Sequence, residues 1–67
     1  MSTILGALIA TARDLNEPGE PNNEYARGQA ELIVDACGLE MDGAREHVQD
    51  CITHKITRDE LWGHIGQ

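Results

Sequence analysis

Phenylalanine is absent from this chain of 67 residues, and Tyr25 and Trp62 are its only aromatic residues. The interior must therefore be built from Leu, Ile, Val, Ala and Met, which suits helices packed at close range. A chain of this length buries only about 60% of the surface that its unfolded form exposes. Because so thin a core gives marginal stability to a monomer, we expect the protein to associate as a homodimer.

Basic residues are also scarce, with five Lys and Arg against twelve Asp and Glu and a net charge of −7. Nucleic-acid binding requires a basic surface, so this charge disfavours it, and an anionic membrane surface is disfavoured for the same reason. Residues 1–42 hold eight of the acidic residues against Arg13 and Arg27. We expect a protein partner with a basic surface to meet this half of the chain.

Long apolar runs are missing as well. No run approaches the roughly 20 residues that are needed to span a bilayer. The apolar stretch 4–12 has no basic residues before it, as a signal peptide would. We therefore predict a cytoplasmic protein in which Cys37 and Cys51 are reduced.

Proline occurs only at positions 18 and 21, which places one linker at 16–23. Outside it, apolar residues recur at spacings of three and four, as on one face of an amphipathic helix. The sequence contains no strand-like alternation and no internal repeat. It predicts one all-α domain, a small bundle of three helices (3–15, 24–37 and 43–55) plus a short C-terminal fourth helix (58–65).

Several helix ends carry capping signals. We expect caps at Ser2 or Thr3, at Asn23 and at Asp42, and a left-handed residue at Gly38. The sharpest signal is a capping box between Thr57 and Glu60. Gly28 lies inside the second helix, where glycine costs up to about 1 kcal/mol relative to alanine. A close helix crossing is the expected reason for this glycine.

The apolar spacing also predicts which side of each helix is buried. The expected buried residues are Ile4, Leu5, Leu8, Ile9, Ala12 and Leu15 in the first helix, and Tyr25, Ala26, Ala30, Leu32, Ile33, Ala36 and Cys37 in the second. One face of the third helix carries Ala44, Val48, Cys51, Ile52 and Lys55, and the fourth helix has a short apolar edge of Leu61, Trp62 and Ile65.

Two cysteines and two histidines form a set with the ligand types of a zinc site: Cys37, His47, Cys51 and His54. The spacing lacks the tight first pair of a zinc finger. Antiparallel helices would also separate Cys37 from Cys51 by about 12 Å. We favour small core cysteines and surface histidines, with no metal and no cofactor, and keep a Cys/His metal-stabilised domain as an alternative.

No arrangement in the sequence predicts catalysis. A nucleophilic cysteine needs a base beside it and a pocket, and a four-helix chain of this size leaves little room for a substrate cleft. The seven glycines are scattered and form no phosphate-binding loop. We therefore expect no enzymatic activity.

The candidate interface residues fall into two groups. Tyr25, Arg27 and Trp62 are of types that are enriched at protein interfaces, although Tyr25 and Trp62 also suit the edge of the core, and Arg27 also suits an ion pair with Glu24 or Glu31. The acidic candidates are Glu17, Glu20, Glu24 and Glu31, and these residues together with Asp35 also suit mimicry of nucleic-acid phosphates. An acidic surface that serves solubility alone is the simpler interpretation.

A helix-turn-helix module is a further alternative, in which the third and fourth helices place Arg45, Lys55 and Arg58 at a phosphate backbone. Asp59 and Glu60 stand where the recognition helix would approach DNA, which argues against this alternative.

The segment Glu24–Ile33, followed by Gly38-Leu39, resembles a segment of short uncharacterised acidic proteins of actinobacteria and their phages. The resemblance covers residues 24–39 and includes no catalytic motif. It implies a setting, that of a phage-encoded accessory protein that modulates a host protein, and it transfers no functional residues. Charge, size and this setting together predict a small acidic helical module for protein–protein interaction.

Overall fold

The structure is a computed structural model that describes residues 3–66. Over this range the chain forms four helices and no strand: α1 (Thr3–Asp14), α2 (Asn23–Cys37), α3 (Ala44–Ile52) and α4 (Arg58–Ile65). The predicted all-α class is therefore confirmed. None of these helices combines the length and the apolar character that a membrane span requires.

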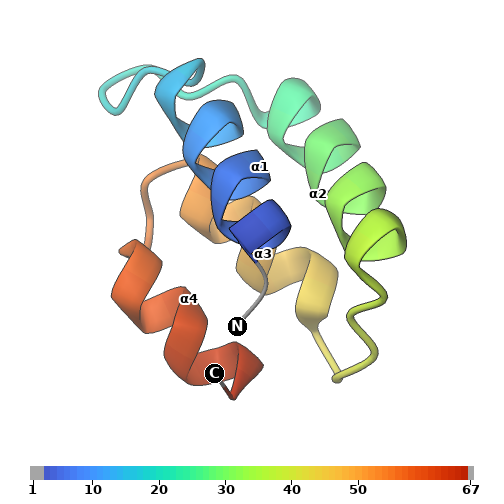
Figure 1. Ribbon diagram of the computed structural model, residues 1–67. Helices are drawn as coiled ribbons and strands as arrows, with labels where there is room; N and C mark the ends of the chain where they lie inside the picture. The colour runs from blue at the N-terminus through green and yellow to red at the C-terminus, as the bar shows by residue number, and fades with distance from the viewer. Residues whose placement is uncertain (1–2, 67) are drawn as a thin grey trace.

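The helices pack around a single centre. α2 packs against α3, α1 contacts both of them, and α4 packs against α3. Figure 1 shows α1 at the front of the molecule, with α2 beside it and α3 behind it. Each of the four helices contributes buried side chains, and these are Leu5, Ile9 and Ala12, then Ala26, Ala30 and Ile33, then Val48, Cys51 and Ile52, and finally Leu61.

The buried stripes of α1 and α2 are narrower than the apolar spacing predicts. Ile4, Leu8 and Leu15 are exposed, and so is Leu32 on α2. Ala36 is also exposed, so these positions of the expected buried sides are wrong. Lys55, expected on one face of the third helix, lies beyond the end of α3. The reason is that each helix contacts its neighbours over a limited arc, which periodicity alone does not define.

Two helix starts differ from the expected ones by one residue. Asn22, and not Asn23, caps α2, because its Oδ1 accepts a hydrogen bond from the backbone N–H of Tyr25. The N-cap of α3 is Gly43, at φ 75°, and not Asp42. Gly43 makes no side-chain capping bond, so the left-handed backbone that glycine permits sets the start of this helix. The expected cap at Ser2 lies outside the described residues, as does the side chain of Thr3.

The C-terminus of α2 follows the prediction. Gly38 is left-handed, at φ 63°, and the N–H of Leu39 donates to the carbonyl of Val34. A glycine in this position satisfies the last free carbonyls of the helix without the steric cost that a Cβ atom would bring.

α3 ends at Ile52, three residues before the expected end. The Thr53 hydroxyl donates to the carbonyls of Gln49 and Asp50. His54 then takes a left-handed backbone at φ 65°, which is uncommon for a residue other than glycine. The helix cannot continue through this conformation.

α4 begins as the sequence predicts. Thr57 accepts a hydrogen bond from the N–H of Glu60, and the Glu60 carboxylate accepts one from the N–H of Thr57. Both bonds of the capping box are present.

The expected close crossing at Gly28 is wrong. Gly28 is exposed, and a Cβ atom at this position would have no neighbour within 4 Å. The structure gives no packing reason for this glycine.

Candidate functional site

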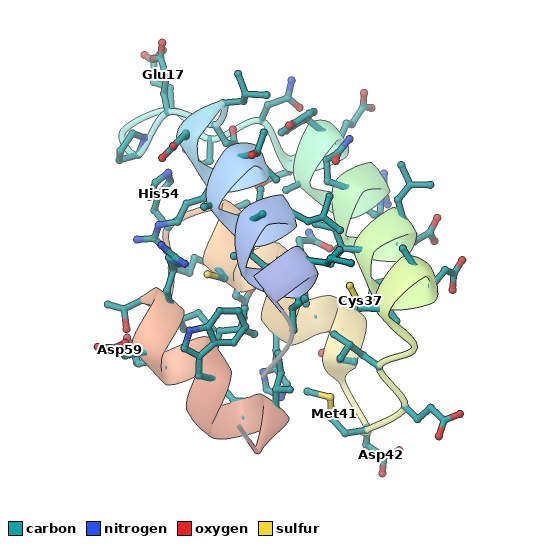
Figure 2. The ribbon with its side chains drawn as sticks, in the orientation of Figure 1. Glu17, Cys37, Met41, Asp42, His54 and Asp59 are labelled. Carbon is teal, nitrogen blue, oxygen red and sulfur yellow. The ribbon has the colours of Figure 1, made fainter. Side chains whose placement is uncertain are left out.

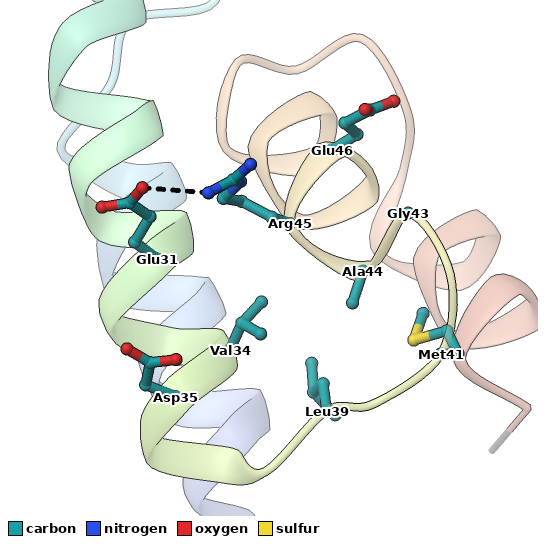
Figure 3. Close-up of a pocket in the computed structure, with 9 residues that line it drawn as sticks. All are labelled: Glu31, Val34, Asp35, Leu39, Met41, Gly43, Ala44, Arg45 and Glu46. Atoms are coloured by element: carbon teal, nitrogen blue, oxygen red, sulfur yellow. Dashed lines mark hydrogen bonds and ion pairs between the residues drawn. The ribbon is translucent and has the colours of Figure 1, made fainter.

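A hollow of about 520 Å³ lies between α2, the loop that follows it and the start of α3 (Figure 3). Gly38 and Gly43 position its walls, because both take left-handed backbones that turn the chain between the two helices. We call this hollow the α2–α3 groove. Its lining residues are Glu31, Val34, Asp35, Leu39, Met41, Gly43, Ala44, Arg45 and Glu46.

The groove has an apolar part and a charged part. Its apolar residues are Val34, Leu39, Met41 and Ala44, of which Ala44 is buried and the other three are half-buried. Methionine is unbranched and adapts its shape to what packs against it. These side chains therefore offer a deformable apolar surface that is already partly withdrawn from water.

The charged part of the groove is mainly acidic. Glu31, Asp35 and Glu46 contribute three carboxylates, and Arg45 contributes the single guanidinium among the lining residues. An Nη1 atom of Arg45 lies 3.0 Å from Oε1 of Glu31, and both side chains are more than half exposed. An exposed pair of this kind contributes about 0–1 kcal/mol to stability. Asp35 and Glu46 are also exposed, so their carboxylates stay available at the surface.

This ion pair corrects an expectation. Glu31 pairs with Arg45 on α3, and not with Arg27 on its own helix. Among the described residues, no carboxylate lies within ion-pair distance of Arg27, which is exposed.

The other predicted interface residues do not lie at the groove. Glu17 and Glu20 lie in the exposed linker, and Figure 2 shows Glu17 at the opposite end of the molecule from Met41 and Asp42. Glu24 is exposed in the first turn of α2. Of the seven predicted interface residues, Glu31 is the one that lines the groove.

Tyr25 and Trp62 have the positions of core-edge residues. Both are half-buried and pack against the central cluster. Trp62 also lines a second hollow of about 460 Å³, together with Arg13, Thr57, Arg58 and Asp59.

The four residues of the possible zinc set lie apart in the structure. Cys37 is half-buried at the end of α2, and Cys51 is fully buried in α3. Figure 2 shows Cys37 and His54 on opposite sides of α1. His47 stacks on His64 of α4, with ring centroids 4.0 Å apart and ring planes 7° from parallel. Within residues 3–66 no three His, Cys, Asp or Glu side chains are grouped to hold a metal ion.

His54 belongs to a network that the sequence analysis missed. Its Nε2 atom lies 2.6 Å from the carbonyl oxygen of Asn16 and 3.0 Å from that of Arg13. Arg13 in turn donates through Nη1 to the carbonyl oxygens of Ile56, at 2.8 Å, and Cys51, at 3.0 Å. The network ties the end of α1 to the end of α3 and the connection to α4.

Asn16 extends the same network into the linker. It is buried, and its Oδ1 accepts a hydrogen bond of 2.7 Å from the N–H of Asn22. One sequence signal of this network was available, since Arg13 is a lone basic residue directly after the uncharged stretch 3–12.

Cys51 is poorly suited to nucleophilic chemistry. Burial raises the pKa of the Cys51 thiol, and the hydrogen bond from Arg13 and the charges of Arg13 and Arg58 offset this only in part. The thiol is therefore held in its protonated form at neutral pH, and the thiolate is the nucleophilic form.

The α3–α4 pair bears on the helix-turn-helix alternative. α4 has eight residues and begins with Arg58, Asp59 and Glu60. Hydrogen bonding to Thr57 lowers the pKa of the exposed Glu60 carboxyl, so Glu60 is ionised at neutral pH. Two carboxylates at the start of this helix would repel a phosphate backbone.

The chain was also compared with known proteins. No protein-family model matches it, and neither a curated protein nor a solved structure does. The geometry of the α2–α3 groove is therefore the basis for the functional proposal.

Proposed function

We propose that this protein is a small acidic helical interaction module whose α2–α3 groove binds a basic segment of a partner protein. The observation that carries the proposal is that four apolar residues and three acidic residues line one hollow. An apolar side chain of the partner would pack on Val34, Leu39 and Met41. Lys or Arg residues on either side of it would face Asp35 and Glu46.

The charge of the whole chain supports this choice of partner. A net charge of −7 attracts a basic surface from a distance and steers its approach, and close charge pairs then hold it in register. The groove itself gives the apolar contact that a purely solubilising acidic surface would lack. In the setting implied by the resemblance, the partner is a protein of the bacterial host and the module modulates it by binding, without catalysis.

The size and chemistry of the groove favour a side chain over a small ligand. Small-molecule sites of similar volume are mostly apolar, with a few polar groups that fix the orientation of the ligand. Here four of the lining residues are charged, and only Val34, Leu39, Met41 and Ala44 are apolar. This arrangement matches the apolar core and polar rim of a protein–protein contact.

The proposal is tested by selecting binders from a random peptide library on the immobilised protein at low salt. We expect enriched peptides to carry an aliphatic or aromatic residue between Lys or Arg residues. The substitution D35K should raise the dissociation constant of these peptides about tenfold, which corresponds to the loss of one close charge pair. Nuclear magnetic resonance should place the bound peptide at the methyl groups of Val34 and Ala44.

The matched control is E20K, which makes the same change of charge in the linker, away from the groove. It should alter the dissociation constant far less than D35K. Enriched peptides without basic residues, or equal effects of the two substitutions, would refute binding in the groove.

A further inference from the structure

The exposed apolar side chains of this protein are concentrated on one face. Four large hydrophobic residues are exposed in the described part of the chain, and all of them belong to α1, its last turn or α2. They are Ile4, which is 66% exposed, Leu8 at 37%, Leu15 at 69% and Leu32 at 63%. Each is of a type that is normally buried.

Three of these residues share one side of α1. Ile4, Leu8 and Leu15 are separated by four and seven positions, and this spacing returns to the same side of a helix. Leu15 follows the last residue of α1 and continues its hydrogen bonding, because its N–H donates to the carbonyl of Thr11. The three side chains therefore form a row along the full length of the helix.

Leu32 extends this row onto α2. Glu31 and Val34 face α3, since they line the groove between the two helices. Successive residues of a helix are rotated by about 100°. Leu32 therefore projects from the other side of the buried Ile33, away from α3 and toward α1. We call Ile4, Leu8, Leu15 and Leu32 the α1 strip.

The α1 strip differs from the groove in having no charged residue within it. α1 contains no charged residue before Arg13, and the guanidinium of Arg13 is directed to the C-terminal end of α3 and the connection to α4. Asp14 is the one acidic residue of α1. A helix that is apolar around most of its circumference is normally covered on both sides. In Figure 1, no described element covers the near side of α1.

We propose that a second copy of this chain covers the α1 strip, with the two α1 helices antiparallel across a twofold axis. Such an interface uses the same patch on both copies, so the patch must be compatible with itself. The uncharged strip meets this condition, whereas the acidic groove would repel its own copy. Antiparallel pairing also brings Asp14 of each copy near the N-terminal end of the partner helix, where the helix dipole stabilises a negative charge.

The chemistry of the strip selects this occupant over a basic partner. Lys or Arg residues of such a partner would find no carboxylate within the strip and would be better placed at the groove. A second copy brings only the same uncharged surface. It also adds apolar burial to a core that is thin for a chain of this length.

The first test is sedimentation equilibrium over a wide range of protein concentration. We expect the wild-type chain to approach twice the mass of one chain. I4E and L15E each place a carboxylate in the strip at a position that is about two-thirds exposed, so the monomer fold should be retained. Each should raise the dimer dissociation constant at least about tenfold, since a carboxylate buried without a partner is costly.

The control is G63E, which adds the same carboxylate to α4 at a site where a Cβ atom has no neighbour within 4 Å. It should leave the dimer dissociation constant unchanged, and circular dichroism should show equal helix content in all variants. A wild-type chain that is monomeric at every concentration would overturn the proposal. So would a dimer that I4E and L15E leave intact, since another face would then form it.

A second experiment tests the orientation of the helices. Antiparallel pairing places position 4 of one copy opposite position 15 of the other, because the strip on α1 runs from Ile4 to Leu15. I4C and L15C chains, mixed in a C37S background, should therefore form a disulfide between unlike copies under mild oxidation, faster than either chain does alone, which requires Cα atoms within about 7 Å of each other. Cys51 is buried and does not compete. A dimer that forms without this cross-link would overturn the antiparallel arrangement.

Discussion

At the scale of single residues, Arg13 does the most to hold distant parts of the chain together. Its guanidinium donates to backbone carbonyls of Cys51 and Ile56, which lie 38 and 43 positions further along the chain. The carbonyl of Arg13 in turn lies within hydrogen-bonding distance of the His54 ring. A single side chain thus joins the end of α1 to the end of α3.

Removal of this guanidinium should destabilise the fold. R13M keeps most of the aliphatic stem but leaves the carbonyl of Ile56 without its donor, so we expect a loss of about 1–3 kcal/mol in the free energy of unfolding. The comparison is R27M, at an exposed arginine, which should change stability by less than about 0.5 kcal/mol. Urea denaturation measures the free energy of unfolding of both variants. Equal stability of the two variants would mean that the Arg13 hydrogen bonds make no net contribution.

At the scale of elements, the capping box makes the stability of α4 dependent on pH. Hydrogen bonding to Thr57 lowers the pKa of Glu60 in the folded chain. The folded state therefore binds the proton more weakly than the unfolded state does. The contribution of Glu60 is complete above its unfolded pKa and disappears as the pH falls through its lower, folded pKa.

We expect T57A to lower stability by about 1 kcal/mol at neutral pH. The free energy of unfolding of E60Q should fall less at acidic pH than that of the wild type, because E60Q has no carboxyl to protonate at this position. D59N changes the neighbouring residue outside the capping box, so it should keep the acid-induced loss that is due to Glu60. The measurement is urea denaturation between neutral and acidic pH. An unchanged pH dependence in E60Q would show that the capping box does not carry this effect.

Local features of the elements were predictable from sequence, and features that depend on neighbours were not. The helices, the linker, the left-handed Gly38 and the Thr57–Glu60 box depend on residues a few positions apart. The Arg13–His54 network joins residues about 40 positions apart, so no local pattern indicates it. The end of α3 was missed because His54 takes a left-handed backbone, which is uncommon for residues other than glycine and which no local pattern indicates.

Only part of the candidate site was predictable from the sequence. Glu31 was selected for its charge and does line the groove. Val34, Leu39 and Met41 carried no signal of their own, because an apolar residue on a helix or loop is expected to be covered. Leu32 was wrongly placed in the core because the spacing of apolar residues does not tell how far round α2 the contact with α1 extends.

At the scale of the whole molecule, the protein presents two surfaces of different chemistry. The α2–α3 groove is acidic, and the α1 strip is uncharged and apolar. The strip lies on the side of α2 away from the groove. A dimer through the strip would therefore leave both grooves open, and each dimer would offer two binding sites for partner proteins.

Added salt should act on the two surfaces in opposite directions. Salt screens the attraction between the acidic groove and a basic peptide, so the peptide dissociation constant should rise with ionic strength. The same screening reduces repulsion between two chains that each carry a charge of −7, so the dimer dissociation constant should fall. Calorimetry and sedimentation at matched salt concentrations measure the two trends. If both dissociation constants rose or both fell with salt, the assignment of peptide binding to the groove and of dimerisation to the α1 strip would be contradicted.

The stacked rings of His47 and His64 give the molecule a spectroscopic reporter of its own. Each ring lies in the ring-current field of the other, since their planes are nearly parallel and their centroids are 4.0 Å apart. Their C–H proton resonances should therefore be displaced upfield from those of free imidazole while α4 is docked on α3. When α4 detaches from α3, the resonances of both rings should return together to the positions of free imidazole. The position of this helix can thus be followed in a one-dimensional proton spectrum without any label.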